Sequence, residues 1–280
     1  MVTERIAGAD DPRIAEYRDV AEPELVRSRG LFVAEGRLVV GRLIEDRRFI
    51  VRSLLVSDAA FRSLRPALDA LPPEVAVYIC DAPDFLGITG HDIHRGCLAL
   101  VERPAPLTVD RLLRTPDPVD PAPPTGPRGP ALLVILEGVA NADNVGGVFR
   151  NAAAFGADAV LLSPSSCDPL YRKAIRTSMA ETLRVPFARV EPWPGGLEQL
   201  RAAGFSIVAL TPREPALTLD AFAAQRPQKI ALLLGTEGDG LSAAAESMAD
   251  VRVRIPIAHA VDSLNLAVAS GIALHRLGTV

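Results

Sequence analysis

From about position 31 onward the chain repeats one pattern: a short apolar run rich in Val, Leu and Ile, then a segment whose apolar positions recur every three or four residues. Apolar runs of this length are typical of buried strands, and the wider spacing is typical of helices with one buried face. Alternating strands and helices predict an α/β protein with largely parallel sheets.

The first part of the pattern predicts a small α/β/α domain, with Asp58 capping one of its helices. The strands are expected at 31–36, 50–57, 74–80 and 97–102, and the helices at 37–46, 58–70 and 82–88. A proline-rich stretch then interrupts the pattern, with room for only a short helix near Asp110 to Arg114. Such a stretch cannot build a packed core and is typical of a semi-rigid linker. We therefore expect an N-terminal domain at 1–103, a linker at 104–130 and a second domain at 131–280.

The second domain resumes the alternation and predicts a parallel sheet with helices on both faces. Its strands are expected at 131–136, 158–163, 184–190, 205–210, 229–235 and 251–257, and its helices at 144–156, 169–180, 196–204, 242–248 and 263–277. In such sheets ligands bind beyond the carboxyl ends of the strands.

Composition narrows the class of protein. Nearly half of the residues are hydrophobic and few are aromatic, which fits an aliphatic core. A charged N-terminus and the lack of a long apolar run predict a cytoplasmic protein with neither signal peptide nor membrane span. Three scattered cysteines fit a reducing compartment. The net charge of −4 gives no general attraction to nucleic acid, so RNA binding would need a local basic patch.

Three loops at predicted strand ends could carry chemistry. In the first, Asn144, Gly146 and Gly147 open a helix, with Arg150 one turn in. Glycines there allow close approach of a ligand to free backbone N–H groups, although an Asn cap with tight helix packing explains the same residues equally well. The second, Gly-Thr-Glu-Gly-Asp-Gly from Gly235, is neither a phosphate loop nor a dinucleotide fingerprint.

The third loop follows Ile255 and Pro256 and leads to Ser-Leu-Asn at 263–265. Taken alone, its polar side chains are better explained as a helix cap than as ligand contacts.

The order and spacing of the three loops resemble the SpoU (TrmH-like) family of RNA 2′-O-ribose methyltransferases, of the SPOUT class. The resemblance rests on Asn-x-Gly-Gly-x-x-Arg, then Gly-Thr-Glu-Gly-x-Gly-Leu-Ser, then Ile-Pro followed by Ser-Leu-Asn-x-x-x-Ala, and covers about 131 to 280. The N-terminal domain resembles that family's substrate-binding domain more weakly, through "FVAEGRLVV" and "ITGHDIHRGCLALVERP". The resemblance implies a deep C-terminal trefoil knot, which general topology rules would not predict. It also implies S-adenosylmethionine as cofactor and a homodimer formed through the C-terminal domain.

The family's cofactor loops correspond to these positions of the chain: Leu210, Thr211, Gly235, Thr236, Glu237, Gly238, Ile255 and Leu264. Its active-site positions correspond to Arg150, Asn144, Glu237, Ser263 and Asn265. Because the pKa of an arginine exceeds 12, we expect Arg150 to orient a ribose phosphate and stabilise developing alkoxide charge rather than to act as a base. Glu237 and Asn144 are expected to hold its guanidinium. The chain departs from the family by having Ala258, His259 and Ala260 where a glycine usually follows Ile-Pro.

Other polar residues leave alternatives open. Arg172, Lys173 and Arg176 either bind RNA phosphates or form a solvated helix face. The histidines and cysteine of "HDIHRGC" have a spacing that hints at a metal, but a structural site needs about four ligands, so we expect no metal. RNA contact by His94 and Arg95 is the better functional reading. The resemblance thus predicts methylation of structured RNA, ribosomal RNA before transfer RNA, with a non-catalytic RNA-binding protein as the rival.

Overall fold

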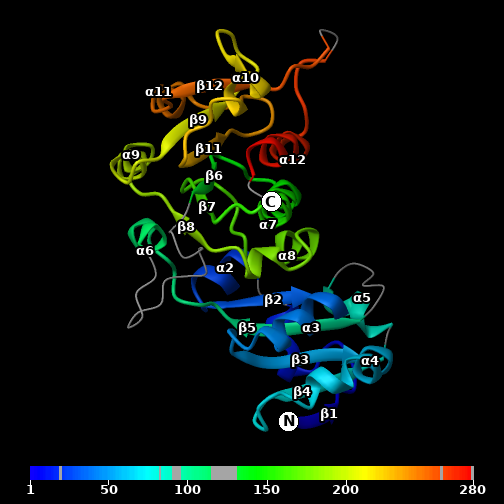
Figure 1. The fold of residues 1–280 in the computed structure, drawn as a ribbon. Helices are drawn as coiled ribbons and strands as arrows, with labels where there is room; N and C mark the ends of the chain where they lie inside the picture. Colours follow the sequence, from blue (N-terminus) through cyan, green and yellow to red (C-terminus); the bar gives the residue numbers. More distant parts are fainter. Residues whose placement is uncertain (19–20, 82, 90–95, 115–130, 259–260, 279–280) are drawn as a thin grey trace. The chain divides into compact units, whose positions relative to one another are not determined.

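The computed structural model describes residues 1–18, 21–81, 83–89, 96–114, 131–258 and 261–278 (Figure 1). The chain divides into two compact units, each described here by itself. Unit 1 comprises Met1–Ala105 and Pro169–Leu183, and unit 2 comprises Pro106–Asp168 and Arg184–Val280.

Unit 1 is built on a five-stranded mixed sheet with the strand order β1-β4-β3-β5-β2. Its strands are β1 (Val2–Arg5), β2 (Leu31–Glu35), β3 (Val51–Ser57), β4 (Ala76–Cys80) and β5 (Cys97–Glu102). The strands β1, β4 and β3 are parallel, whereas β5 runs antiparallel to both β2 and β3. Apart from β1, each of these strands overlaps a range that the apolar pattern predicts.

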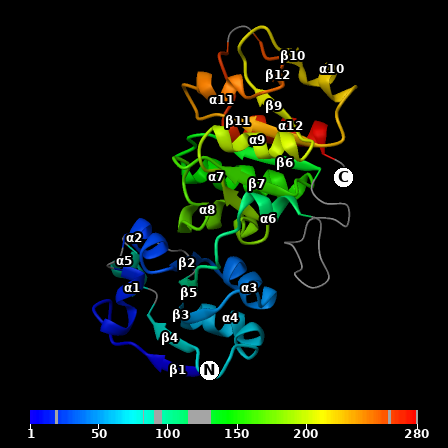
Figure 2. The ribbon, with the colours of Figure 1, turned by 90° about the vertical axis from the view of Figure 1, so that its left-hand side faces the viewer.

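Helices cover both faces of this sheet, as Figure 2 shows, and complete the predicted α/β/α sandwich. The helices of unit 1 are η1 (Pro12–Ile14), α1 (Ala15–Arg18), α2 (Glu22–Arg27), α3 (Arg37–Asp46), α4 (Asp58–Leu68), α5 (Asp84–Thr89), α8 (Arg172–Thr177) and η2 (Glu181–Leu183), with α8 packed against the edge strand β2. The helix α3 pairs with α4, while α1, α2 and α5 bury apolar side chains in a core with β2, β3 and β5.

The expectation that Asp58 caps α4 is wrong. The N-cap is Ser57, whose hydroxyl accepts a hydrogen bond from the Ala60 N–H at 3.2 Å. Asp58 is the first helical residue and pairs with Arg5 at 2.7 Å. Either residue type is a good cap, so local sequence does not choose between them. The contact with β1, far away in sequence, engages the Asp58 carboxylate and lowers its pKa.

Unit 2 contains a seven-stranded sheet in the order β10-β12-β9-β11-β6-β7-β8, with every pairing parallel. Its strands are β6 (Leu132–Leu136), β7 (Ala159–Leu162), β8 (Phe187–Arg189), β9 (Ser206–Leu210), β10 (Leu217–Thr218), β11 (Ile230–Leu234) and β12 (Val251–Arg254). The central strands β6, β9 and β11 are almost wholly buried, which is why they appear as continuous apolar runs.

Helices flank this sheet on both faces (Figure 1). They are α6 (Val109–Leu113), α7 (Ala142–Ala154), η3 (Gly195–Leu197), α9 (Glu198–Ala202), α10 (Leu219–Ala223), α11 (Ala243–Ser247) and α12 (Leu266–Leu277). The helices α6, α9 and α11 pack on one face through an apolar core, and α12 packs against α7. The parallel sheet with helices on both faces is as the sequence predicts.

Two segments lie elsewhere than the predicted boundaries suggest. Part of the expected linker is ordered in unit 2, because Leu107 bridges to Ala188 and α6 buries Val109 and Leu112 in the core. The rest of the linker, 115–130, lies outside the described residues. The segment Pro169–Leu183, which separates β7 from β8 in sequence, belongs to unit 1.

Candidate active site

A cavity of about 270 Å³ opens in unit 2 at the carboxyl ends of β9, β11 and β12. It is lined by Leu210, Thr211, Pro212, Leu234, Gly235, Thr236, Glu237, Gly238, Gly240, Ile255, Ile257, Ser263, Leu264, Asn265, Leu266 and Ala269. These residues come from the last positions of β9 and β11, from the loops that follow the three strands and from the start of α12. The strands are neighbours in the sheet, so their following loops meet at one edge, where ligands of parallel sheets bind.

The loop after β11 is folded back tightly against the strand end. Thr236 and Gly240 form an isolated antiparallel bridge, and the Gly240 N–H donates to the Thr236 carbonyl at 3.1 Å. Gly238 and Gly240 have φ values of +93° and +72°, a region that other L-residues rarely adopt. A side chain at Gly235 would run into the backbone of Gly240. The glycines therefore let the backbone line the cavity closely.

Asn265 joins this loop to two helices. Its Oδ1 accepts from the N–H groups of Ala267 and Val268 at 2.9 and 3.2 Å, so it is the N-cap of α12. Its Nδ2 donates to Glu237 Oε1 at 2.6 Å and to Asn144 Oδ1 at 3.0 Å. Every hydrogen-bonding direction of the amide is used, and its orientation is fixed. The cap reading and the site reading of Ser-Leu-Asn are therefore compatible.

The structure gathers most of the predicted site residues around this cavity. All eight predicted cofactor residues line it, as do Ser263 and Asn265. Asn144 is buried and is not among the lining residues, but its side chain accepts a hydrogen bond from the lining residue Asn265. Arg150 is exposed on α7 and is not among the lining residues.

The expected contact between Arg150 and the pair Asn144 and Glu237 is replaced by another. The side chains of Asn144 and Glu237 both accept from the Asn265 amide. The tertiary approach of α12 to α7 supplies this donor, and sequence spacing alone gives no sign of it. Arg150 remains accessible from solvent.

Glu137, at the end of β6, is a polar anchor that the sequence analysis missed. Its buried carboxylate accepts from Trp193 Nε1 at 2.9 Å, from Ser242 N at 2.9 Å and from Ser242 Oγ at 2.7 Å. Ser242 in turn caps α11 by accepting from the Ala245 N–H. The Gly-rich loop is therefore fixed where it enters α11. An acidic residue directly after an apolar strand was the signal that could have found it.

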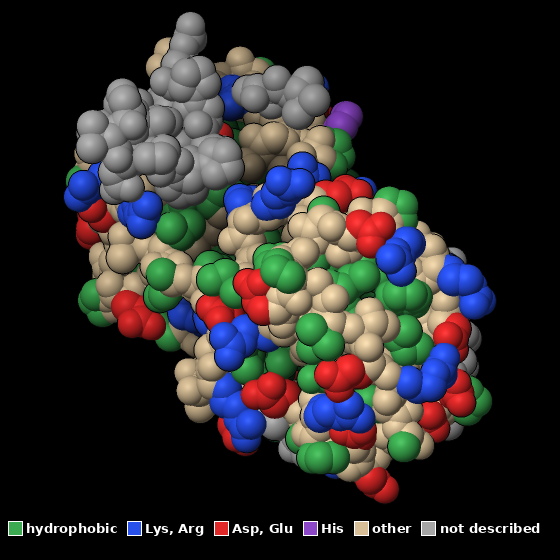
Figure 3. Space-filling view, turned by 90° about the horizontal axis from the view of Figure 1, so that it is seen from below, with side chains coloured by type: hydrophobic (Ala, Val, Ile, Leu, Met, Phe, Trp, Pro, Cys, Tyr) green, Lys and Arg blue, Asp and Glu red, His purple; other side chains and the backbone are tan. Residues whose placement is uncertain are grey.

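The predicted basic patch on α8 is engaged by an acid. Glu35, buried at the end of β2, pairs with Arg176 at 2.9 Å and with Arg172 at 3.5 Å. These pairs hold α8 on β2 in unit 1, while Lys173 and Arg176 stay exposed. Lys173 lies on the same helix, while His94 and Arg95 lie outside the described residues. On the face drawn in Figure 3, basic and acidic described side chains are interspersed.

The described part of the chain also bears on metal binding, cysteine reactivity and membrane insertion. It contains no group of three or more His, Cys, Asp and Glu residues that could hold a metal ion, although His91 and His94 are not described. Cys80, Cys97 and Cys167 are buried and form no disulfide bond with one another. Burial raises the pKa of the Cys80 and Cys97 thiols to about 12, so both are protonated at neutral pH. No described helix is long and apolar enough to cross a membrane.

Comparison with known proteins extends these findings. Residues 131–275 match the family model described as the SpoU rRNA Methylase family. An uncharacterized tRNA/rRNA methyltransferase of Mycobacterium tuberculosis is 38% identical over 277 residues, which cover 97% of this chain and 90% of the relative. The 23S rRNA (guanosine-2′-O-)-methyltransferase RlmB of Ralstonia nicotianae is 29% identical over 238 residues, covering 84% and 90%.

Among solved structures, the SpoU methyltransferase AviRb from Streptomyces viridochromogenes, in complex with AdoMet, superposes with a TM-score of 0.75. It is 25% identical, and the match covers 95% of this chain and 97% of AviRb. Family model and relatives cover the cavity, its loops and nearly the whole of both units. The chain therefore belongs to the SpoU rRNA methylase family.

Proposed function

We propose that the protein transfers a methyl group from S-adenosylmethionine to a ribose 2′-OH in structured RNA, with ribosomal RNA as the substrate. The observation that carries this proposal is the cavity itself. Every cofactor position expected from the resemblance lines one hollow at the carboxyl edge of the sheet, although the positions span Leu210 to Leu264 in sequence. The family membership and the AdoMet complex of AviRb support the choice of cofactor.

The cavity suits the chemistry of S-adenosylmethionine. Leu210, Ile255 and Leu264 offer apolar surface for an adenine ring, and the backbone of the Gly-rich loop offers polar groups without side chains in the way. Glu237 is an acid among the lining residues, and its charge favours a cationic sulfonium over a phosphate. The bound cofactor would supply an electrophilic methyl group.

The chain's own residues would then bind and orient the ribose. We infer that the Arg150 guanidinium binds the phosphate next to the reacting ribose and stabilises the charge that develops on its 2′-oxygen. Ser263 and Asn265 would line the transfer cavity, with Asn144 and Glu237 fixing the Asn265 amide.

A homodimer through the C-terminal domain follows from the same proposal. Arg150 does not line the cavity of its own chain, so a second copy is the natural source of the arginine. Two large apolar side chains on α12, Val268 and Ile272, are 51% and 41% exposed and lie one turn apart. An exposed apolar stripe next to the cavity is typical of a subunit interface. We propose that α12 forms part of it.

RNA recognition is assigned in this proposal to the N-terminal domain at 1–103, joined through the stretch at 104–130. Arg172, Lys173, Arg176, His94 and Arg95 stay candidates for RNA contact. For Arg172 and Arg176 the phosphates would have to compete with Glu35. Ribosomal RNA is preferred because the family model and the Ralstonia relative carry that substrate in their names.

Replacement of Arg150 by alanine tests the mechanism. We expect kcat for methyl transfer to fall about 10²–10³-fold, because a positioned charge on the reacting group is lost. Calorimetry should give an unchanged Kd for S-adenosylmethionine, since the proposed partner of Arg150 is the ribose phosphate and not the cofactor. Arg201→Ala, at the opposite end of the sheet, is the matched control. Wild-type turnover in Arg150→Ala would contradict the assigned role.

The substrate is tested by mapping 2′-O-methyl groups in total RNA from cells with and without the gene. A ribosomal site that disappears on deletion is the expected result. Loss of a transfer RNA site instead would move the substrate to tRNA. A wild-type protein that binds RNA but not S-adenosylmethionine would favour a non-catalytic RNA-binding protein.

A further inference from the structure

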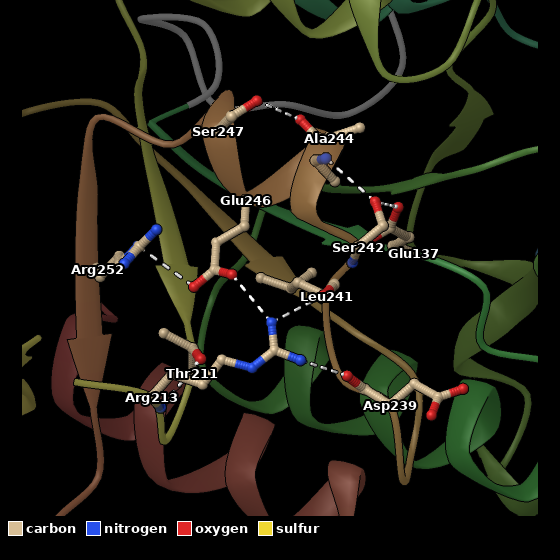
Figure 4. A network of polar contacts seen from close by, with 11 residues as sticks. Glu137, Thr211, Arg213, Asp239, Leu241, Ser242, Ala244, Glu246, Ser247 and Arg252 are labelled. Carbon is tan, nitrogen blue, oxygen red and sulfur yellow. Dashed lines mark hydrogen bonds and ion pairs between the residues drawn. The ribbon is translucent and has the colours of Figure 1, made fainter. Parts of the chain in front are cut away.

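Arg213, in the loop after β9, holds the backbone of the Gly-rich loop that lines the cavity. Its Nη2 donates to the Asp239 carbonyl at 2.8 Å, and its Nη1 donates to the Leu241 carbonyl at 3.3 Å (Figure 4). A planar guanidinium presents several donors in a fixed geometry, so one side chain restrains two points of the loop at once.

A buried acid aims this guanidinium. Glu246 on α11 is 7% exposed at its side chain and accepts from Arg213 Nη1 at 3.1 Å. The other oxygen of Glu246 lies 3.3 Å from Arg252 Nε on β12. In Figure 4 the two arginines approach the carboxylate from opposite sides. A buried carboxylate is costly unless it is paired, and this pairing therefore keeps the Arg213 side chain against the loop.

The backbone of Arg213 is bonded to a second residue that lines the cavity. Its N–H donates to Thr211 Oγ1 at 3.2 Å. Thr211 is buried and is one of the lining residues. Through Arg213, the loop after β9 and the loop after β11 are thus connected.

We propose that Arg213, oriented by Glu246, is a positioning residue that sets the shape of the cofactor cavity. The inference rests on the proposed S-adenosylmethionine site and adds a residue to it that does not line the cavity. Arg213 holds the Gly-rich loop at Asp239 and Leu241. The same loop is held at Glu237 by Asn265, and its end at Ser242 is held by Glu137.

The physical reason is the freedom of the loop. Gly235, Gly238 and Gly240 lie within six residues, and glycine has the largest backbone entropy to lose on ordering. Without Arg213 the loop would sample other conformations. Part of the binding free energy of the cofactor would then be used to order the loop. Affinity for the cofactor would then fall by the fraction of time that the loop is competent.

The test replaces Arg213 by methionine, which keeps the length of the side chain and removes its donors. We expect Kd for S-adenosylmethionine, measured by calorimetry, to rise roughly tenfold. In steady-state kinetics KM for S-adenosylmethionine should rise similarly, with KM for RNA and kcat at saturating cofactor unchanged. Hydrogen exchange of the amides at 236–241 should be faster. Arg213→Lys, which keeps the charge but not the fork, should raise Kd by a smaller factor.

Arg201→Met is the matched control. Arg201 also binds a carbonyl, that of Met248 at 2.7 Å, and two carboxylates, Asp250 and Glu198, but at the amino end of the sheet. Its Kd should equal that of the wild type. An unchanged Kd in Arg213→Met, or an equal rise in Arg201→Met, overturns the inference. If Arg213→Met does not fold, an unchanged Kd in Arg213→Lys overturns it. Wild-type protein that binds no S-adenosylmethionine refutes the proposed function instead.

Discussion

At the scale of single residues, the site depends on side chains that serve two purposes. Asn265 caps α12 with its oxygen and holds Glu237 and Asn144 with its nitrogen. Glu137 likewise binds Trp193 and the start of α11. One side chain that fixes both a helix end and a loop leaves the cavity few ways to change shape.

Asn265→Asp separates the two purposes. Aspartate caps helices as well as asparagine does, so α12 keeps its cap. The two donated hydrogen bonds are lost, and a second carboxylate faces Glu237, which sits 2.6 Å from the amide nitrogen. We expect the free energy of unfolding to fall by about 1–3 kcal/mol and affinity for S-adenosylmethionine to fall with it.

Urea denaturation and calorimetry measure the two effects. Thr218→Ala removes the cap of α10, where the Thr218 hydroxyl accepts from the Ala221 N–H. It should cost about 1 kcal/mol of stability without changing affinity. Wild-type stability and affinity in Asn265→Asp would show that the amide bonds contribute nothing.

At the scale of elements, the packing of α12 against α7 holds the first residues of α12 at the cavity. A Cβ on Gly147 would lie 2.6 Å from the Cβ of Ala267, so the two helices touch where the predicted glycine motif lies. Asn151 on α7 also donates to the Ala267 carbonyl and to Ser270 on α12. The resemblance implies that the C-terminal segment, which carries α12, forms a deep trefoil knot, and this knot stays a prediction.

Gly147→Ala should therefore push α12 away from α7. Overpacking of a close contact typically costs about 1–3 kcal/mol, and we expect a loss of that size in urea denaturation. Gly195→Ala is the control, since a Cβ there meets no atom within 4 Å. A Gly147→Ala protein as stable as the control would mean that the helices can separate without cost.

At the scale of the whole molecule, the proposed dimer depends on the exposed apolar side chains of α12. Ile272→Glu places a charge in the exposed stripe on α12 and should convert dimers to monomers in sedimentation experiments. Leu38→Glu, at a side chain that is 49% exposed on α3 of unit 1, should leave the oligomeric state unchanged. If Ile272→Glu sediments as the wild-type dimer does, the stripe is not the interface.

The sequence by itself determined the helices and strands whose buried positions recur at a regular spacing. The helix 37–46 and the strand 97–102 were predicted with the bounds that the structure has, and all predicted cofactor positions line the cavity. The strand β1 was not predicted, because its side chains are mostly exposed and only its pairing with β4 defines it. Periodicity reports burial, and an exposed edge strand has little of it.

Only the tertiary structure decided the partners of the polar groups. In the structure Asn265 donates hydrogen bonds to Asn144 and Glu237. Glu35 forms ion pairs with Arg172 and Arg176, and the segment Pro169–Leu183 belongs to unit 1. These partners are distant in sequence, and a charged or amide side chain can satisfy its hydrogen bonds with many alternatives. The predicted cofactor positions, which the family resemblance implied, thus line one cavity, whereas the contacts around it depend on which helix ends the fold brings together.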